Sequence, residues 1–360
     1  MKFFCCRLLA GSALLAALVI LLATSAFAQA RRYASVPTRI EIGAVPITSF
    51  DNRDPSQIRF GALEFRGGLE LTSNNPAFGG ISGLHIEPDG AHFLAVTDHG
   101  SWLRGRIVYR DGKPAGITDA EMAPILGSDD KPLAARGWYD TESLTERDGI
   151  FYVGIERVEQ IVRLDYRRDG FKARAEPIKV PPDFKTFKYN RSLECLVAPP
   201  QGSPLAGMLI AVTERSLDAR GNLRSFLLDG DRVTRFSVKR TDDFDVSDCA
   251  ILPPSDLLLL ERRYSLLRGV AIRIRRVPLE SLKMGALVDG RAMIEADLAY
   301  AIDNMEGMAV HRTSSGEMII TLVSDDNFSF IQRNLLLQFA IVGSETFGMA
   351  GGTKTWMPGT

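Results

Sequence analysis

Residues 141–156 read TESLTERDGIFYVGIE. Two short runs rich in apolar and β-branched residues are joined by Asp148-Gly149, and this arrangement predicts a β-hairpin. One acid, Glu142, stands near the start of the stretch and a second, Glu156, ends it. Because positions 142 and 156 are equally distant from Gly149, the hairpin brings the two acids together at the end opposite the turn.

The same hairpin pattern recurs along the chain. In each copy, one position corresponds to Glu142, and we call it the marked position. The marked positions are residues 82, 142, 194, 248 and 306, which gives spacings of 60, 52, 54 and 58 residues. The residues at these positions are Ser82, Glu142, Glu194, Asp248 and Glu306. Each is followed by a strand, a turn rich in Pro, Gly, Asp or Ser, and an apolar returning strand. A third and a more polar fourth strand fit most units, and four antiparallel strands per unit of this length are typical of a propeller blade.

We therefore predict an all-β protein, a β-propeller of five blades by the repeat count. The segment 38–48 could belong to a sixth blade, so six blades stay open. The strand expected within 58–72 precedes the first repeat as fourth strands precede the others, and the last unit lacks its own fourth strand. This N-terminal strand is expected to complete the last blade and close the ring. No linker divides residues 29–360, which we interpret as one propeller domain.

Residues 1–28 have the pattern of a secretory signal peptide. Lys2 and Arg7 precede an apolar run, and Ala26-Phe27-Ala28 is a small-x-small cleavage site. We expect Sec-type export, cleavage after Ala28, and a periplasmic or secreted mature protein. An uncleaved anchor is the alternative, because the run approaches membrane-spanning length. Export permits a disulfide between Cys195 and Cys249, but we favour two buried thiols in the packing between blades.

Composition and missing motifs exclude several classes of protein. The chain of 360 residues is 45% hydrophobic with a formal net charge of -1, which fits neither a disordered chain nor a basic nucleic-acid binder. It has no nucleophile elbow, P-loop or dinucleotide-binding glycine motif, and its four histidines lack the spacing of a zinc site. We expect a small-molecule substrate, no nucleic-acid partner, no membrane contact after cleavage, and a monomer.

Each returning strand also ends in an acid, and four of the five marked positions carry one, so carboxylates gather at the end of each hairpin opposite its turn. If the first strand of each unit is innermost, nine acids face one mouth of the propeller. These metal-ligand candidates are Asp98, Glu142, Glu156, Glu194, Glu214, Asp248, Glu261, Glu306 and Asp325. Like charges so close cannot all stay ionised without partners. Oxygen-only ligands suit Ca²⁺, whereas ion pairs with Arg157, Arg191, Arg215 and Arg262 are the alternative explanation.

The ordered motifs resemble those of the phytase-like family, "esterase-like activity of phytase", over residues 60–340. The resemblance is carried by Ser82-Gly83-Leu84 with Thr97-Asp98-His99-Gly100, by Tyr139–Leu144 with Glu156, by Arg191–Glu194 with Thr213-Glu214-Arg215, and by Asn304–Met308 with Ser324–Asn327.

This resemblance implies a Ca²⁺-dependent phosphoester hydrolase in which the mouth acids hold the metal. The catalytic candidates are then Glu194, Glu306, Arg191 and Arg157, with the two arginines as phosphate clamps. Two alternatives stay open: a lactonase-type metal-dependent hydrolase, and a non-catalytic propeller that binds a ligand or serves as a scaffold.

Overall fold

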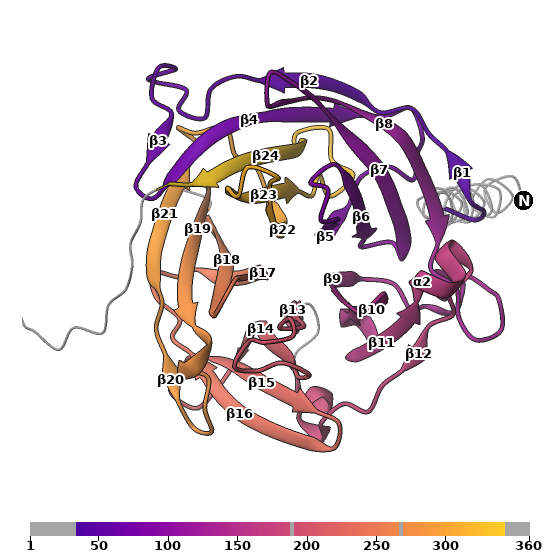
Figure 1. Ribbon diagram of the computed structural model, residues 1–360. Helices are drawn as coiled ribbons and strands as arrows, with labels where there is room; N and C mark the ends of the chain where they lie inside the picture. Colours follow the sequence, from indigo (N-terminus) through magenta and orange to yellow (C-terminus); the bar gives the residue numbers. More distant parts are fainter. Residues whose placement is uncertain (1–33, 188–190, 266–268, 343–360) are drawn as a thin grey trace, which may run out of the picture.

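The computed structural model describes residues 34–187, 191–265 and 269–342. The predicted signal peptide lies outside these residues. Five β-sheets are arranged in a ring around a central axis, with the first strand of each repeat innermost (Figure 1). The predicted five-bladed β-propeller is therefore confirmed. No helix in the described ranges is long and apolar enough to cross a membrane.

Blades 1 to 3 each begin at the axis with the strand that follows a marked repeat position. Blade 1 contains β5 (Ile81–Ile86), β6 (His92–Thr97), β7 (Ser101–Arg110), β8 (Lys113–Pro124) and β1 (Thr38–Arg39). Blade 2 contains β9 (Thr141–Arg147), β10 (Ile150–Ile155), β11 (Gln160–Asp165) and β12 (Glu176–Pro177). Blade 3 contains β13 (Leu193–Val197), β14 (Leu209–Leu217), β15 (Leu223–Asp229), β16 (Arg232–Val238) and β20 (Leu287–Val288).

Blades 4 and 5 complete the ring. Blade 4 contains β17 (Asp245–Leu252), β18 (Asp256–Ser265), β19 (Gly269–Pro278) and β21 (Arg291–Asp297). Blade 5 contains β22 (Met305–Arg312), β23 (Met318–Ser324), β24 (Asn334–Ile341), β4 (Leu63–Thr72) and β2 (Gly43–Ile47), with β3 (Arg59–Phe60) beside β4. The helical turns are η1 (Leu133–Arg136), η2 (Glu156–Val158), α2 (Tyr166–Asp169), η3 (Gly170–Lys172), η4 (Pro182–Thr186) and η5 (Leu279–Ser281).

The two ends of the described chain meet in blade 5. β4 pairs antiparallel with β24, from Leu63 opposite Ile341 to Leu71 opposite Asn334, so the N-terminal strand closes the ring as predicted. The preceding segment 38–48 does not form a sixth blade. Its first part, β1, pairs with β8 of blade 1, and its second part, β2, pairs with β4 of blade 5. This segment thus connects two neighbouring blades along their outer edges.

Apolar side chains from facing sheets pack between the blades, and Cys195 and Cys249 lie in one such cluster. The two cysteines form a disulfide between β13 and β17, with a Cα–Cα distance of 5.1 Å. Our preference for two free thiols was therefore wrong, although both side chains are buried between blades as expected. The innermost strands of neighbouring blades lie close enough together for this covalent link.

Candidate functional site: an acid ring with one arginine

Every inner hairpin contains a β-bulge near the end opposite its turn. In blade 1 the pairing passes from Ile81–Thr97 to Gly83–Val96, so Ser82 is the extra residue. The corresponding shifts in blades 2, 3 and 5 leave Glu142, Glu194 and Glu306 as the extra residues. A bulge bends its strand and re-aims the side chain at that position. In four blades, the marked position of the sequence repeat is therefore the bulged residue.

Blade 4 departs from this rule by one residue. Val246 pairs with Glu261 and Asp248 with Leu260, so the bulged residue is Ser247 rather than Asp248. The hydrogen bonds of the two serine hydroxyls support this equivalence of Ser247 and Ser82. Ser247 Oγ donates to the carbonyl of Met305 at 2.9 Å, and Ser82 Oγ donates to the carbonyl of Thr141, which likewise precedes the bulged residue of the next blade. Counting from the bulge, Arg262 occupies the position that Asp98, Glu156, Glu214 and Asp325 hold in the other blades.

The expectation that Asp248 and Glu261 face the mouth is thus corrected. Asp248 Oδ2 accepts the N–H of Met308, in the neighbouring blade, at 2.6 Å, and burial raises the pKa of Asp248 well above its ordinary value. Glu261 is fully buried. Its carboxylate accepts bonds from Arg273 Nε at 2.7 Å and from Arg275 Nη2 at 2.5 Å, both on β19. Both acids serve the packing of blade 4.

The other seven predicted acids remain at the ends of their hairpins, and most of them are close enough for their charges to raise the pKa of a neighbouring acid. They are Asp98, Glu142, Glu156, Glu194, Glu214, Glu306 and Asp325. We call this set, together with Arg262, the acid ring. The pKa of Glu142 is raised well above its ordinary value by burial and then by acids that include Asp98, Glu156 and Asp325. The pKa of Glu194 is raised likewise by burial and by Glu142, Glu214 and Glu156.

Arg262 supplies the positive charge on one side of this ring. Its Nη1 donates to Glu306 Oε1 and, at 2.6 Å, to Asn304 Oδ1. Its Nη2 lies 3.4 Å from Glu214 Oε1. Asn304 Nδ2 also donates to Glu306 Oε1, at 2.8 Å. Burial opposes the charge of Arg262, but Glu194, Glu214, Glu142 and Asp325 outweigh burial and raise its pKa.

The opposite side of the ring has no such arginine, although His99 Nδ1 lies 2.8 Å from Asp98 Oδ1. It consists of Asp98, Glu142 and Asp325 together with Asp140, which precedes the bulge of blade 2 by two positions. Within the described ranges, no lysine or arginine forms an ion pair with any of these four carboxylates. Burial, and then the charge of Asp98, raise the pKa of Asp325 to about 8. The same two causes raise the pKa of Asp140, whose Oδ2 is buried without a hydrogen-bond partner.

Glu156 and Glu194 lie between these two sides. Glu156 Oε1 accepts the N–H of Ser192 at 2.6 Å, and burial raises its pKa to about 7. Glu194 is 4% exposed, and its Oε2 has no hydrogen-bond partner. A buried carboxylate oxygen without a partner is costly, so this atom marks a place where a cation or a proton is needed.

The two arginines that were predicted as phosphate clamps lie beside Glu156 and are exposed. Arg157 follows Glu156, and its guanidinium carbon stands 4.4 Å from the centre of the Tyr139 ring. Arg191 precedes Ser192, and its carbonyl accepts the hydroxyl of Ser216 at 3.0 Å. The structure therefore places the guanidinium group of Arg157 and the backbone of Arg191 at the adjoining hairpin ends of blades 2 and 3.

Asp140, Asn304 and the ring position of Arg262 were not predicted as parts of the site. A signal for the first two exists, because both stand two residues before a bulged acid. That position pairs through its backbone with the residue that ends the hairpin: the N–H of Glu156 donates to Asp140 and that of Asp325 donates to Asn304. A polar residue there is therefore directed toward the ring by the same hairpin geometry.

Carboxylate oxygens without nitrogen or sulfur ligands fit a hard cation such as Ca²⁺. The partnerless Oδ2 of Asp140 and Oε2 of Glu194 support this fit. Among the described residues, however, no three Asp, Glu, His or Cys side chains converge on one point as a metal site. The acids surround the axis, so binding a cation would require some of these side chains to rotate inward.

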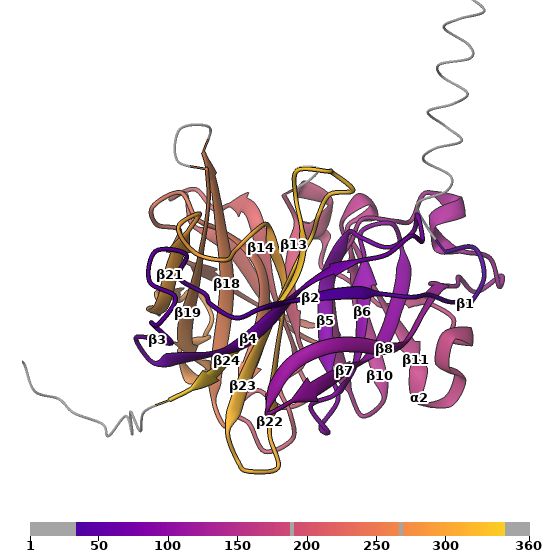
Figure 2. The same ribbon diagram turned by 90° about the horizontal axis from the view of Figure 1, so that it is seen from above.

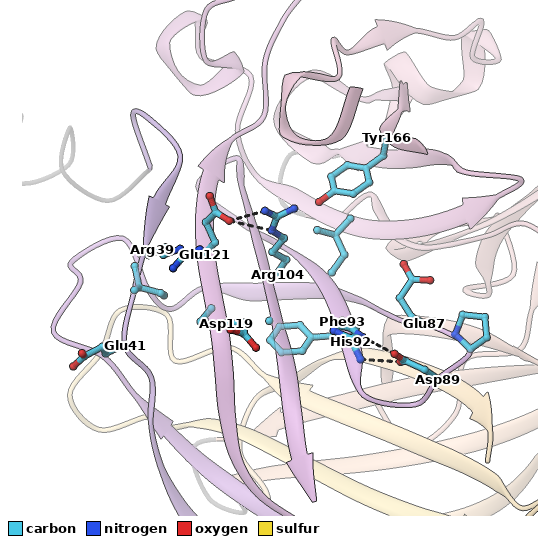
Figure 3. Close-up of a pocket in the computed structure, with 15 residues that line it drawn as sticks. Arg39, Glu41, Glu87, Asp89, His92, Phe93, Arg104, Asp119, Glu121 and Tyr166 are labelled. Carbon is cyan, nitrogen blue, oxygen red and sulfur yellow. Dashed lines mark hydrogen bonds and ion pairs between the residues drawn. The ribbon is translucent and has the colours of Figure 1, made fainter. Parts of the chain in front are cut away.

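A pocket of about 980 Å³ lies away from the ring, on the outer part of blade 1 (Figure 3). Its wall includes the ion pairs Arg104–Glu121 and His92–Asp89, together with Tyr166 from α2. None of the predicted site residues lines it. The pocket lies apart from the hairpin ends that form the acid ring, so we do not include it in the candidate site.

The sequence model of one protein family, described as "Phytase-like: Esterase-like activity of phytase", matches residues 76–328, well over half of the chain. Among curated proteins, none matches the chain. Similar solved structures include the PQQ-bound aldose sugar dehydrogenase of Streptomyces coelicolor, with 13% identity, a TM-score of 0.41, and coverage of 85% of this chain and 100% of that chain. Glutaminyl cyclase of Myxococcus xanthus gives 10% identity, a TM-score of 0.39, and coverage of 85% and 100%. At these scores the likenesses say nothing about function.

Proposed function

The chain belongs to the phytase-like family, and from this premise we propose that it is a Ca²⁺-dependent phosphoesterase that acts on a small molecule at the acid ring. The observation that carries the proposal is the side of the ring formed by Asp98, Asp140, Glu142 and Asp325. Burial and the charges of neighbouring acids raise the pKa values of Asp140, Glu142 and Asp325, and none of the four acids forms an ion pair with arginine or lysine in the described structure. A bound cation would remove this repulsion.

These four residues would hold the calcium ion. When bound, the ion would supply positive charge next to the phosphoryl oxygens of the substrate. Arg157 and Arg191, at the adjoining hairpin ends of blades 2 and 3, would bind other phosphoryl oxygens through their planar guanidinium groups. The substrate would thus lie across the face of the propeller that carries the ends of β6, β10 and β23 (Figure 2).

Glu194 and Glu156 would handle protons. Both have raised pKa values, so each holds a proton at a pH where an ordinary glutamate has lost it. A protonated carboxyl beside the substrate donates to the leaving oxygen, and its carboxylate accepts the proton of the attacking water. Glu306 has a different part, because its Oε1 is bound by Arg262 and Asn304. We assign it the positioning of Arg262 rather than a catalytic role.

We also propose that the chain is exported to the periplasm or beyond, is cleaved after Ala28, and is a monomer in its mature form. The N-terminal sequence pattern supports the export and the cleavage. The Cys195–Cys249 disulfide agrees with an oxidising compartment.

The test starts with mature protein stripped of metal by a chelator. Calcium binding is measured by calorimetry, and turnover is measured on a panel of phosphomonoesters, phosphodiesters and lactones, with calcium and with chelator. We expect calcium binding and calcium-dependent release of phosphate, both lost in Asp98→Asn/Glu142→Gln. Asp231→Asn, an exposed acid on blade 3, is the matched control that keeps both.

Other outcomes identify the alternatives. Calcium-dependent opening of lactones without phosphate release would replace the phosphoesterase by a lactonase-type hydrolase. Calcium binding that raises the melting temperature, without turnover of any substrate in the panel, would favour a propeller whose acids only bind. Absence of calcium binding to the wild type would overturn the metal-dependent proposal.

A further inference from the structure

Blade 4 differs from the other four blades in the charge that it presents to the ring. Its bulged residue is Ser247, and its hairpin ends in Arg262 where the others end in an acid. Each acid of blade 4 near this hairpin end is bound elsewhere. Glu261 is held by Arg273 and Arg275, and Asp248 accepts the N–H of Met308.

Asp245 completes this pattern. It stands two residues before Ser247, the position that Asp140 holds in blade 2. Its carboxylate is bound by two arginines, with Arg240 Nε at 2.6 Å from Oδ1 and Arg215 Nε at 2.6 Å from Oδ2. Blade 4 therefore contributes only positive charge to the ring. This charge depends on the bonds that hold Asp245, Asp248 and Glu261 as well as on the presence of Arg262.

The contacts of Arg262 show what its charge does. Its two terminal nitrogens are directed at Glu306, Asn304 and Glu214, which belong to blades 5 and 3. The side chains of Glu306 and Glu214 are only 7% and 12% exposed, so these ion pairs are largely shielded from water. Because the donors of this guanidinium group are used by acceptors of the protein, the group is poorly placed to bind a substrate anion.

We infer that Arg262 is a built-in countercation that occupies the blade 4 side of the acid ring and confines a bound metal ion to the side formed by Asp98, Asp140, Glu142 and Asp325. Glu306 and Glu214 are then ligands of the arginine and not of the metal. The inference rests on the proposed function for the metal itself, but the role of Arg262 as internal cation is measurable without any metal.

The experiment compares wild type, Arg262→Gln, Arg262→Lys and Arg262→Gln/Glu306→Gln by calorimetric calcium titration. Melting temperature in chelator is measured from pH 5 to pH 8. We expect the wild type and Arg262→Lys to bind one calcium ion. Arg262→Gln releases Glu306 and Glu214, so a second ion binds and the stoichiometry rises from one to two. The double variant removes the charge pair and returns to one ion.

In chelator, Arg262→Gln melts below the wild type at pH 8, and the difference shrinks at pH 5 because the released carboxylates become protonated. The double variant recovers part of the loss. Arg263→Gln is the matched control, because Arg263 is the next residue on β18 and bonds to the carbonyl of Asp242 instead of the ring. If Arg262→Gln fails to fold, Arg262→Gln/Glu306→Gln and Arg262→Lys still test the charge pair.

Different results would overturn the proposed calcium-dependent function and the countercation role of Arg262. A wild type that binds no calcium overturns the proposed function, and the melting series then decides the role of Arg262. An Arg262→Gln protein with unchanged calcium stoichiometry, and with the same melting profile in chelator as Arg263→Gln, overturns the countercation inference even if the wild type binds calcium.

Discussion

Asp98 of blade 1 and Asp325 of blade 5 end neighbouring hairpins, and their carboxylates are close enough for the charge of Asp98 to raise the pKa of Asp325. The contact between the two blades continues at the next residue, where Asp326 Oδ1 accepts the N–H of Gly80 at 3.1 Å. Gly80 in turn accepts the N–H of Asp98 through its carbonyl. The backbone thus holds two like charges together, and the energetic cost of this arrangement depends on pH.

We predict that metal-free protein loses stability as the pH rises from about 4 to about 8. Unfolded carboxyl groups have pKa values near 4, whereas Asp325 in the folded state has a pKa of about 8 and Glu156 of about 7. Between these limits the folded state holds more protons than the unfolded state, so raising the pH favours unfolding. Urea denaturation across this range, with chelator, measures the slope.

Two additions test the cause of this slope. Asp325→Asn is expected to flatten it, because the amide does not titrate, and saturating calcium is expected to flatten it through charge compensation. Asp231→Asn is expected to keep the wild-type slope. A stability that stays level over this pH range in the wild type would contradict the assignment of acids that have no arginine or lysine partner.

A second prediction concerns Glu261, whose position was corrected by the structure. Glu261→Gln removes the buried countercharge that Arg273 and Arg275 share and leaves them only the exposed carboxylates of Asp242 and Asp289; breaking such a buried pair costs about 3–5 kcal/mol of unfolding free energy. Glu317→Gln, which removes an exposed ion pair with Arg66, is expected to cost less than about 1 kcal/mol. Urea denaturation compares the two. Equal losses would show that Glu261 is not a buried structural charge.

The third prediction concerns the disulfide between blades 3 and 4. Cys195 and Cys249 are 54 residues apart in the sequence, and a cross-link over such a loop stabilises a protein by about 2–4 kcal/mol. Cys195→Ser/Cys249→Ser is expected to lower the unfolding free energy by this amount while leaving calcium binding unchanged. Thiol titration of the unfolded mature wild type without reductant is expected to find no free thiol; two thiols per chain would contradict the bridge.

The fourth prediction separates substrate binding from metal binding. Arg157→Gln and Arg191→Gln are each expected to raise KM for a phosphoester by about tenfold or more, since a hydrogen bond to a charged group contributes about 1.5–3 kcal/mol. Their calcium affinity is expected to stay at the wild-type value. Arg312→Gln, beside the β22–β23 turn at the other end of its hairpin, is the control. Unchanged KM in both variants would remove these arginines from the substrate site.

The repeated hairpins were readable from the sequence because their signals are local. Asp148-Gly149 and its counterparts mark the turns, alternating residues mark the strands, and the regular spacing indicates blades. The closing role of β4 followed from the missing strand of the last unit. Seven of the nine predicted acids reach the ring, because a hairpin necessarily brings its two ends together, whatever the packing around it.

Only the tertiary structure decided the register of blade 4. Ser247-Asp248 and Glu261-Arg262 each offer two adjacent polar residues, and a bulge one position earlier or later turns the other member of each pair toward the axis. Which one faces the ring depends on partners far away in the sequence: Arg273 and Arg275 for Glu261, and Glu306 with Asn304 for Arg262. The disulfide was decided in the same way, by the distance between inner strands of neighbouring blades, which no local pattern of residues encodes.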